Sequence, residues 1–162
     1  MIQQKAFTLT QGGADTAAET TIATNIQPGI TFSAWEIVGI EFTIKPDLVK
    51  AWVNNADQDF TIQFTKRSLS GSIARIVTYT DTDLISTFNM AANLAGTAAN
   101  LQFLETTFYQ QMPPGLIVYS ENMYGQIIST GTTQTNVAWG RILYNPVKLT
   151  QAEAMAVIAS RP

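Results

Sequence analysis

A strict period-two alternation in the middle of the chain constrains its fold more than any other feature. In residues 60–65, with the sequence FTIQFT, every even position is apolar and every odd position is polar. Successive side chains of a β-strand point to opposite faces, so this pattern predicts a half-buried strand. Residues 38–44 repeat the pattern, again with the even positions apolar, and residues 20–26 repeat it more weakly.

Runs rich in β-branched and aromatic residues predict five further strands, separated by turn residues. These strands cover residues 73–80, 103–109, 116–120, 124–130 and 136–144. Pro46 and Pro146 are expected to end the strands before them, because proline cannot donate a hydrogen bond to a sheet. Phe7 and Leu9 indicate one additional strand near the N-terminus.

Two segments are predicted to be helical. Thr150 and Glu153 have the spacing of a capping box, which predicts an Ala-rich helix over residues 151–160. Ten residues are too few for a stable helix in water, so this helix is expected to dock on its own sandwich or on a neighbouring subunit.

The second predicted helix covers residues 83–95, between the fourth and fifth of the eight strands from residue 20 onward. Asp83 can cap its start, Leu84 and Phe88 share one face of a helix, and Gly96 can end it.

Many short strands separated by turns are typical of a sandwich or barrel, and eight strands in two packed sheets are typical of a jelly roll. We therefore predict an all-β fold: a two-sheet antiparallel sandwich of jelly-roll type with the two helices described above. The 162 residues suit one domain over 1–162, with 1–18 as an N-terminal extension and 150–160 as a C-terminal helix. An immunoglobulin-like sandwich would leave the middle helix and the tail unexplained.

Composition excludes several classes of function. The chain has no Cys and no His, which removes thiol nucleophiles, disulfides, the usual zinc ligands and His-based acid–base catalysis. The net charge is −3 and the nine basic residues are scattered, so strong binding of nucleic acid by this chain alone is not expected. No signal peptide or membrane-spanning run is expected either.

The remaining groups give little support to catalysis, and we predict that the chain is not an enzyme. A carboxylate pair such as Glu41 and Glu105, brought together on a concave sheet, is the alternative that the residues leave open.

No cofactor is expected, with calcium as the one candidate. Carboxylates stand two residues apart at two predicted strand ends, namely Asp57 with Asp59 and Asp81 with Asp83. Aspartate is also common in turns and at helix starts, which is the alternative interpretation of all four residues.

The low charged fraction, 13% against about 25% in ordinary domains, favours surfaces that meet copies of themselves. The predicted contact residues are apolar groups in loops and in the middle helix: Trp52, Met112, Pro113, Met90, Phe88 and Leu94. Phe88 and Leu94 would alternatively pack that helix on its own sheet, and Trp52 would fasten its loop. Trp139, on the last strand, is expected in the core.

This order of strands and helices over residues 20–144 resembles the single jelly-roll capsid proteins of small icosahedral viruses or phages. The resemblance rests on architecture and composition, with no diagnostic motif. It implies self-assembly into a shell, with copies of the chain and other shell proteins as partners. The chain departs from many capsid proteins in lacking an N-terminal arm rich in Arg and Lys.

The leading hypothesis is therefore a viral coat subunit located in the virion, and otherwise soluble. The alternative is a carbohydrate-binding or adhesin-like β-sandwich. Exposed aromatic residues along one sheet face would favour the alternative, whereas apolar groups at the rim and tips would favour assembly.

Overall fold

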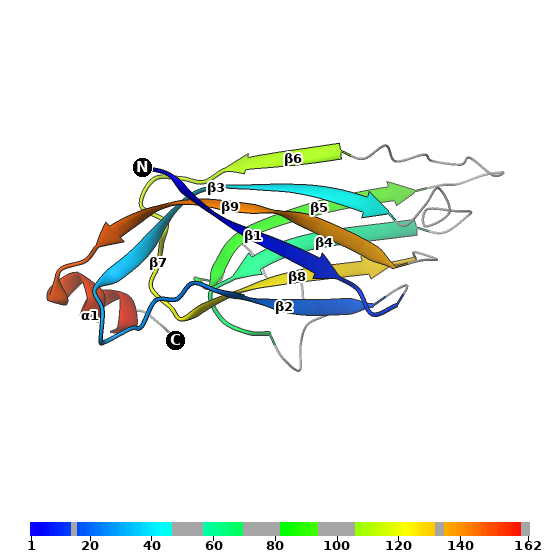
Figure 1. The fold of residues 1–162 in the computed structure, drawn as a ribbon. Coiled ribbons are helices and arrows are strands. Elements are labelled where there is room, and N and C mark those ends of the chain that lie inside the picture. Colours follow the sequence, from blue (N-terminus) through cyan, green and yellow to red (C-terminus); the bar gives the residue numbers. More distant parts are fainter. Residues whose placement is uncertain (14–15, 47–56, 70–81, 94–105, 132–134, 160–162) are drawn as a thin grey trace.

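A computed structural model describes residues 1–13, 16–46, 57–69, 82–93, 106–131 and 135–159 as two antiparallel sheets that pack face to face (Figure 1). The first sheet contains β1 (Gln3–Thr10), β9 (Asn136–Lys148), β3 (Ser33–Pro46) and β6 (Thr106–Gln111) in that order, and β7 (Ile117–Val118) also pairs with β3. The second sheet contains β2 (Ala17–Ala23), β8 (Asn122–Thr130), β4 (Asp57–Thr65) and β5 (Leu84–Asn93). The helix α1 (Gln151–Ala159) lies at one end of the sandwich.

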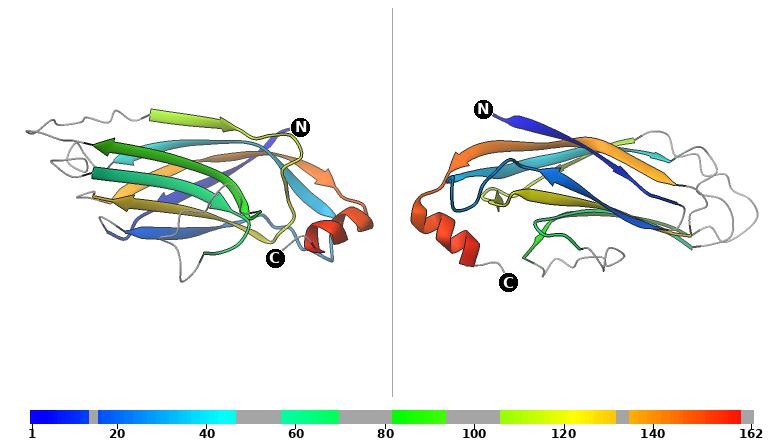
Figure 2. Two further views of the ribbon diagram at one scale, coloured as in Figure 1. Left: turned by 180° about the vertical axis from the view of Figure 1, so that it is seen from behind. Right: turned by 60° about the horizontal axis from the view of Figure 1, so that its bottom comes forward.

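The strand order is that of a jelly roll. The chain passes repeatedly between the two sheets, and β9 inserts between β1 and β3 while β8 inserts between β2 and β4. Figure 2 shows the two resulting layers from two further sides. This arrangement confirms the predicted fold class, a two-sheet antiparallel jelly roll with a short C-terminal helix.

The apolar positions of the alternating strands form the core between the sheets. Phe60, Ile62 and Phe64 of β4 are almost completely buried, as are Ile40 and Phe42 of β3. The inward-facing positions of the two sheets thus meet as the period-two pattern requires.

The polar face of β4 is also buried, so the prediction of a half-buried strand is wrong for this strand. Thr61, Gln63 and Thr65 all lie below 4% exposure. Beyond the end of β4, the Leu69 backbone N–H donates to the Glu19 carboxylate at 2.8 Å. Since Glu19 lies on β2 and β8 separates β2 from β4, residues 66–69 cross the outer face of β8.

The predicted helix over residues 83–95 is wrong, because residues 84–93 form strand β5. Phe88 lies opposite Ile62 of β4, and its ring contacts Phe42 and Phe108 with centroids 5.4 and 4.5 Å apart. A spacing of four residues, as from Leu84 to Phe88, places side chains on one face of a strand as well as of a helix. Pairing with β4 therefore overrides the local helical signal, and residues 94–95 lie outside the described part of the chain.

Several strand boundaries differ from those expected. β9 continues through Pro146 to Lys148, because β1 begins at Gln3 opposite Tyr144 and leaves the rest of β9 at an edge, where proline is tolerated. The expected N-terminal strand is β1. The expected strand over residues 73–80 lies outside the described residues. Within the described ranges, no helix is long and apolar enough to cross a membrane.

Candidate functional site

Three large apolar side chains are exposed at the end of the sandwich that carries α1. Ile30, Phe32 and Met155 are 76%, 43% and 60% exposed, and we call them the α1-end patch. The backbone N–H of Leu149 donates to the carbonyl of Phe32 at 2.7 Å, which joins the segment before β3 to the start of α1. Figure 1 shows this segment and the helix at the same end of the molecule.

The loop that carries Ile30 is hydrogen-bonded to the buried side chain of Tyr119. The Tyr119 hydroxyl donates to the carbonyl of Thr31 at 2.6 Å and accepts from the backbone N–H of Gly29 at 3.0 Å. Gly29 has a φ of 83°, in the left-handed region that suits glycine. Because Tyr119 is buried, these bonds fix the exposed loop to the core, and little conformational entropy remains to be lost on binding.

Met155 is the residue of α1 in the α1-end patch. It lies on the exposed face of the helix, away from the side that packs on the sandwich. Ala154 is buried, and Val157 and Ile158 pack against the core, so the three positions form one helical stripe. The predicted capping box is confirmed: the Glu153 carboxylate accepts the Thr150 backbone N–H at 2.7 Å and the Thr150 hydroxyl at 2.8 Å. These bonds, the backbone bond first, lower the pKa of Glu153.

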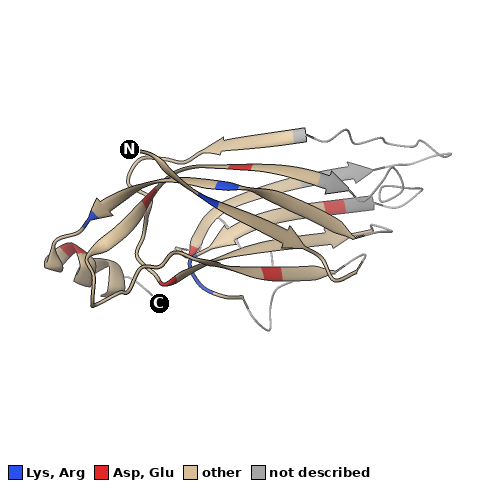
Figure 3. Cartoon of the chain, in the orientation of Figure 1, with Lys and Arg blue, Asp and Glu red and all other residues tan. Residues whose placement is uncertain are grey.

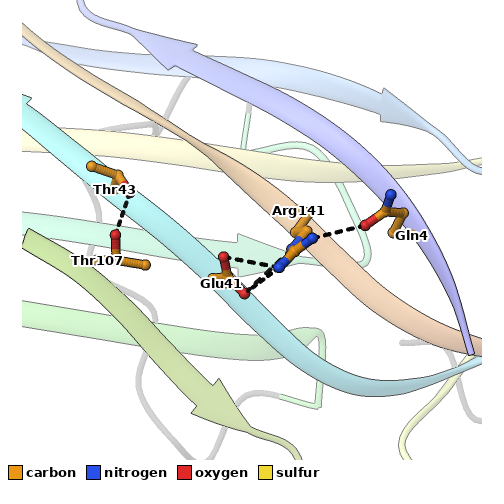
Figure 4. A network of polar contacts seen from close by, with 5 residues as sticks. All are labelled: Gln4, Glu41, Thr43, Thr107 and Arg141. Carbon is orange, nitrogen blue, oxygen red and sulfur yellow. Dashed lines mark hydrogen bonds and ion pairs between the residues drawn. The ribbon is translucent and has the colours of Figure 1, made fainter.

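A second feature, the ion pair between Arg141 and Glu41, lies on the outer face of the first sheet. Arg141 of β9 lies in register with Ala6 of β1 and Glu41 of β3. Its guanidinium donates from Nη2 to both carboxylate oxygens of Glu41, at 2.9 and 3.2 Å, and from Nη1 to the Gln4 side-chain oxygen at 3.1 Å (Figure 4). Figure 3 shows that Lys, Arg, Asp and Glu occupy few positions in the coloured part of the chain.

Trp139 lies on the same outer face, two residues before Arg141. It is in register with Thr8 and Thr43, and the inward-facing positions on either side of it are Ala138 and Gly140. The expectation that Trp139 belongs to the core is therefore wrong, because strand alternation turns it outward, where it is half-buried.

An open hollow of about 460 Å³ lies beside Trp139. It is lined by Gln4, Ala6, Glu41, Phe42, Thr43, Trp139, Gly140 and Arg141. We call these residues the outer-face hollow.

The predicted contact residues fall into three groups: some are packed on the core, one is exposed, and the others lie outside the described residues. Met112 is 6% exposed and packs in the core of its own chain, so its side chain is not presented on the surface. Phe88 packs on its own core, as the alternative interpretation had it. Pro113 is exposed, and its role in contacts stays a prediction. Trp52 and Leu94 lie outside the described residues, as does the side chain of Met90.

The described members of the two candidate calcium pairs lie apart from each other. Asp57 and Asp59 lie at the start of β4, whereas Asp83 precedes β5, and the antiparallel pairing puts these positions at opposite ends of the two strands. The Asp83 carboxylate pairs with Arg67 Nε at 2.6 Å, and Asp81 lies outside the described residues. Across the described ranges, no three metal-ligating side chains cluster, and calcium binding stays a prediction.

The carboxylate pair considered for catalysis is not assembled by the described chain. Glu41 is paired with Arg141, and Glu105 lies outside the described residues.

Sequence reasoning missed Ile30, Phe32 and Arg141. A signal for the first two was present: the turn residues Pro28 and Gly29 directly precede them, which places apolar groups at a loop tip. Arg141 gave no comparable signal, because its partner Glu41 is 100 residues away in the sequence.

No known family model matches the chain, and no curated protein matches it. Solved structures similar to it include VP1 of Trichodysplasia spinulosa-associated polyomavirus, at 10% identity over 90% of this chain and 94% of that one, with a TM-score of 0.48. A chain from Desmodium yellow mottle tymovirus is similar at 10% identity over 93% and 91%, with a TM-score of 0.36. Both TM-scores are below 0.5, so the jelly-roll assignment rests on the strand order of this chain.

Proposed function

We propose that the chain is a non-enzymatic coat subunit that assembles with copies of itself, and with other shell proteins, into an icosahedral virus shell. Its location would then be the virion. The jelly roll supports a structural role but also occurs in lectin domains and cupins, so the argument depends on surfaces of this chain.

The observation that carries the proposal is the α1-end patch. Ile30, Phe32 and Met155 are large apolar side chains exposed at the same end of the domain, and exposed apolar groups that gather at one end mark candidate sites of association. The loop bearing Ile30 is held by the buried Tyr119, which suits a contact that must form many times with the same geometry.

Low charge supports the same conclusion. With 13% charged residues and a net charge of −3, copies of the chain repel one another weakly.

Negative-stain microscopy of the purified full chain, together with a mass measurement over a range of concentrations, tests the proposal. Closed particles of uniform diameter are the expected result. A chain that stays monomeric at the highest soluble concentration would overturn the proposal and would favour the carbohydrate-binding alternative if it also binds immobilised glycans.

A further inference from the structure

We infer that the outer-face hollow is a binding site for a neutral carbohydrate. This site goes beyond the coat function and does not depend on it, since the residues that form it come from the first sheet of one chain. The inference rests on three properties of the hollow: its aromatic neighbours, its fixed planar polar groups and its balanced charge.

The aromatic neighbours lie on both sides of the charged pair. Trp139 precedes Arg141 by two residues on β9, and Tyr109 of β6 lies in register with Glu41 on its other side. Tyr109 is 56% exposed, and Trp139 is half-buried. Aromatic faces of this kind offer an apolar platform with a polar tip, which matches the C–H face of a pyranose ring and its hydroxyl rim.

The hollow exists because a small residue lies beside larger ones. Ala6, in register with Arg141, leaves room on the outer face, and the volume of about 460 Å³ falls within the range of small-ligand sites, about 300–1,000 Å³. Its open form suits one or two sugar units of a surface-bound chain better than an enclosed cofactor.

The polar groups are already fixed in place. Arg141 holds Glu41 through both carboxylate oxygens and holds Gln4 through its side-chain oxygen, so all three planar groups are oriented before any ligand arrives. The side chains of Arg141 and Glu41 are 47% and 31% exposed, so solvent and ligands can reach them. Guanidinium, carboxylate and amide groups together offer the adjacent donors and acceptors that vicinal hydroxyls require.

The balance of charge selects a neutral ligand. Arg141 and Glu41 are the charged residues among those that line the hollow, and they neutralise each other. A phosphate or carboxylate ligand would compete with Glu41 for Arg141, whereas a polyhydroxyl ligand can bond to both.

A panel of immobilised neutral oligosaccharides, probed with the purified full chain, tests the inference, and calorimetry with the free form of the best binder follows. We expect Trp139→Ala to weaken binding by about tenfold or more, which corresponds to the loss of one stacked ring. Trp139→Phe should retain part of the affinity. The exposed variant Gln4→Ala should also weaken binding, and it keeps the test valid if Trp139→Ala fails to fold.

Tyr124→Ala is the matched control, because Tyr124 is a half-buried aromatic residue on the outer face of the second sheet. Its affinity for the same oligosaccharide should be unchanged. Absence of binding to every neutral oligosaccharide of the panel would overturn the inference. Binding confined to acidic glycans, or binding that survives both Trp139→Ala and Gln4→Ala, would overturn it as well. None of these results depends on whether the chain forms particles.

Discussion

The side-chain oxygen of Gln11 accepts two hydrogen bonds from Asn136, one from its backbone N–H at 2.9 Å and one from its side-chain amide at 2.7 Å. The Gln11 amide group in turn donates to the carbonyl of Thr16 and to the hydroxyl of Ser129 at 2.7 Å. Gln11 and Asn136 are both buried. One side chain therefore joins the end of β1 and the start of β9, in the first sheet, to β8 and the segment before β2.

Replacing Gln11 with leucine should destabilise the fold markedly. The change keeps the volume similar but removes the hydrogen bonds that Gln11 makes to Asn136, Thr16 and Ser129, and the loss of bonds to buried polar groups costs about 1–3 kcal/mol for each group affected. We expect a total loss of about 3 kcal/mol in chemical denaturation. Gln111→Leu, at an exposed position of β6, is the control and should change stability by less than about 0.5 kcal/mol. Equal effects of the two substitutions would contradict this account.

The strands were predictable wherever their pattern is local. The alternation in 60–65 and 38–44 and the capping box at Thr150 follow from short-range rules, and the structure confirms the elements that they predict. The sequence alone could not show that the helix expected from residue 83 is wrong, because pairing with β4 decides between helix and strand there.

The surfaces were harder to predict than the strands. Trp139 turns outward and Met112 turns inward because of their strand register and loop path, which depend on contacts with residues far away in the chain. The pairing of Arg141 with Glu41 likewise requires β9 to insert beside β3, a property of the jelly-roll topology that no local motif encodes.

Gly140→Ala should destabilise the protein through a clash between strands. A Cβ at this position would lie 2.0 Å from the carbonyl oxygen of Glu41 and 2.7 Å from the Cα of Phe42, so β9 would have to move away from β3. Overpacking of this kind typically costs about 1–3 kcal/mol, and a rigid backbone neighbour favours the upper end. Thermal unfolding of Gly12→Ala gives the control, because a Cβ at Gly12 has no atom within 4 Å. A melting temperature for Gly140→Ala equal to that of the control would rule out the clash.

Thr150→Ala should weaken the docking of α1. The substitution removes the hydroxyl that accepts the Glu153 backbone N–H at 3.3 Å and donates to its carboxylate. Loss of such a cap costs about 1 kcal/mol, which urea denaturation can measure. Thr150→Ser retains the hydroxyl and should stay within a few tenths of a kcal/mol of the parent chain.

Acidification should loosen the same cap. The Thr150 backbone and side-chain bonds lower the pKa of Glu153 in the folded chain. The unfolded chain, with a glutamate pKa of about 4.3, therefore takes up a proton first, so this stabilisation is present above that pH. It is lost as the pH falls through the lower pKa of the folded state. A comparison of unfolding from pH 6 to pH 3 in the parent chain and in Glu153→Gln should show the two curves converging at low pH. A constant difference between them would contradict the assignment.

Ile30→Asp should block assembly while leaving the subunit folded. Ile30 is 76% exposed, so the substitution removes no core contact, but a carboxylate in the α1-end patch would have to lose its hydration when two copies meet. Light scattering and mass measurement should show particles for the parent chain and monomers or small oligomers for the variant. Ile2→Asp makes the same change at an exposed apolar residue outside the patch and should still assemble.

The salt dependence of this assembly separates apolar contacts from electrostatic ones. If burial of Ile30, Phe32 and Met155 drives association, the assembled fraction of the parent chain should change little between about 50 mM and 500 mM salt, because screening acts on charges and not on apolar area. The low charge of the chain works in the same direction. Particles that dissociate as salt increases, or that form equally well with Ile30→Asp, would show that charged groups or another surface hold the subunits together.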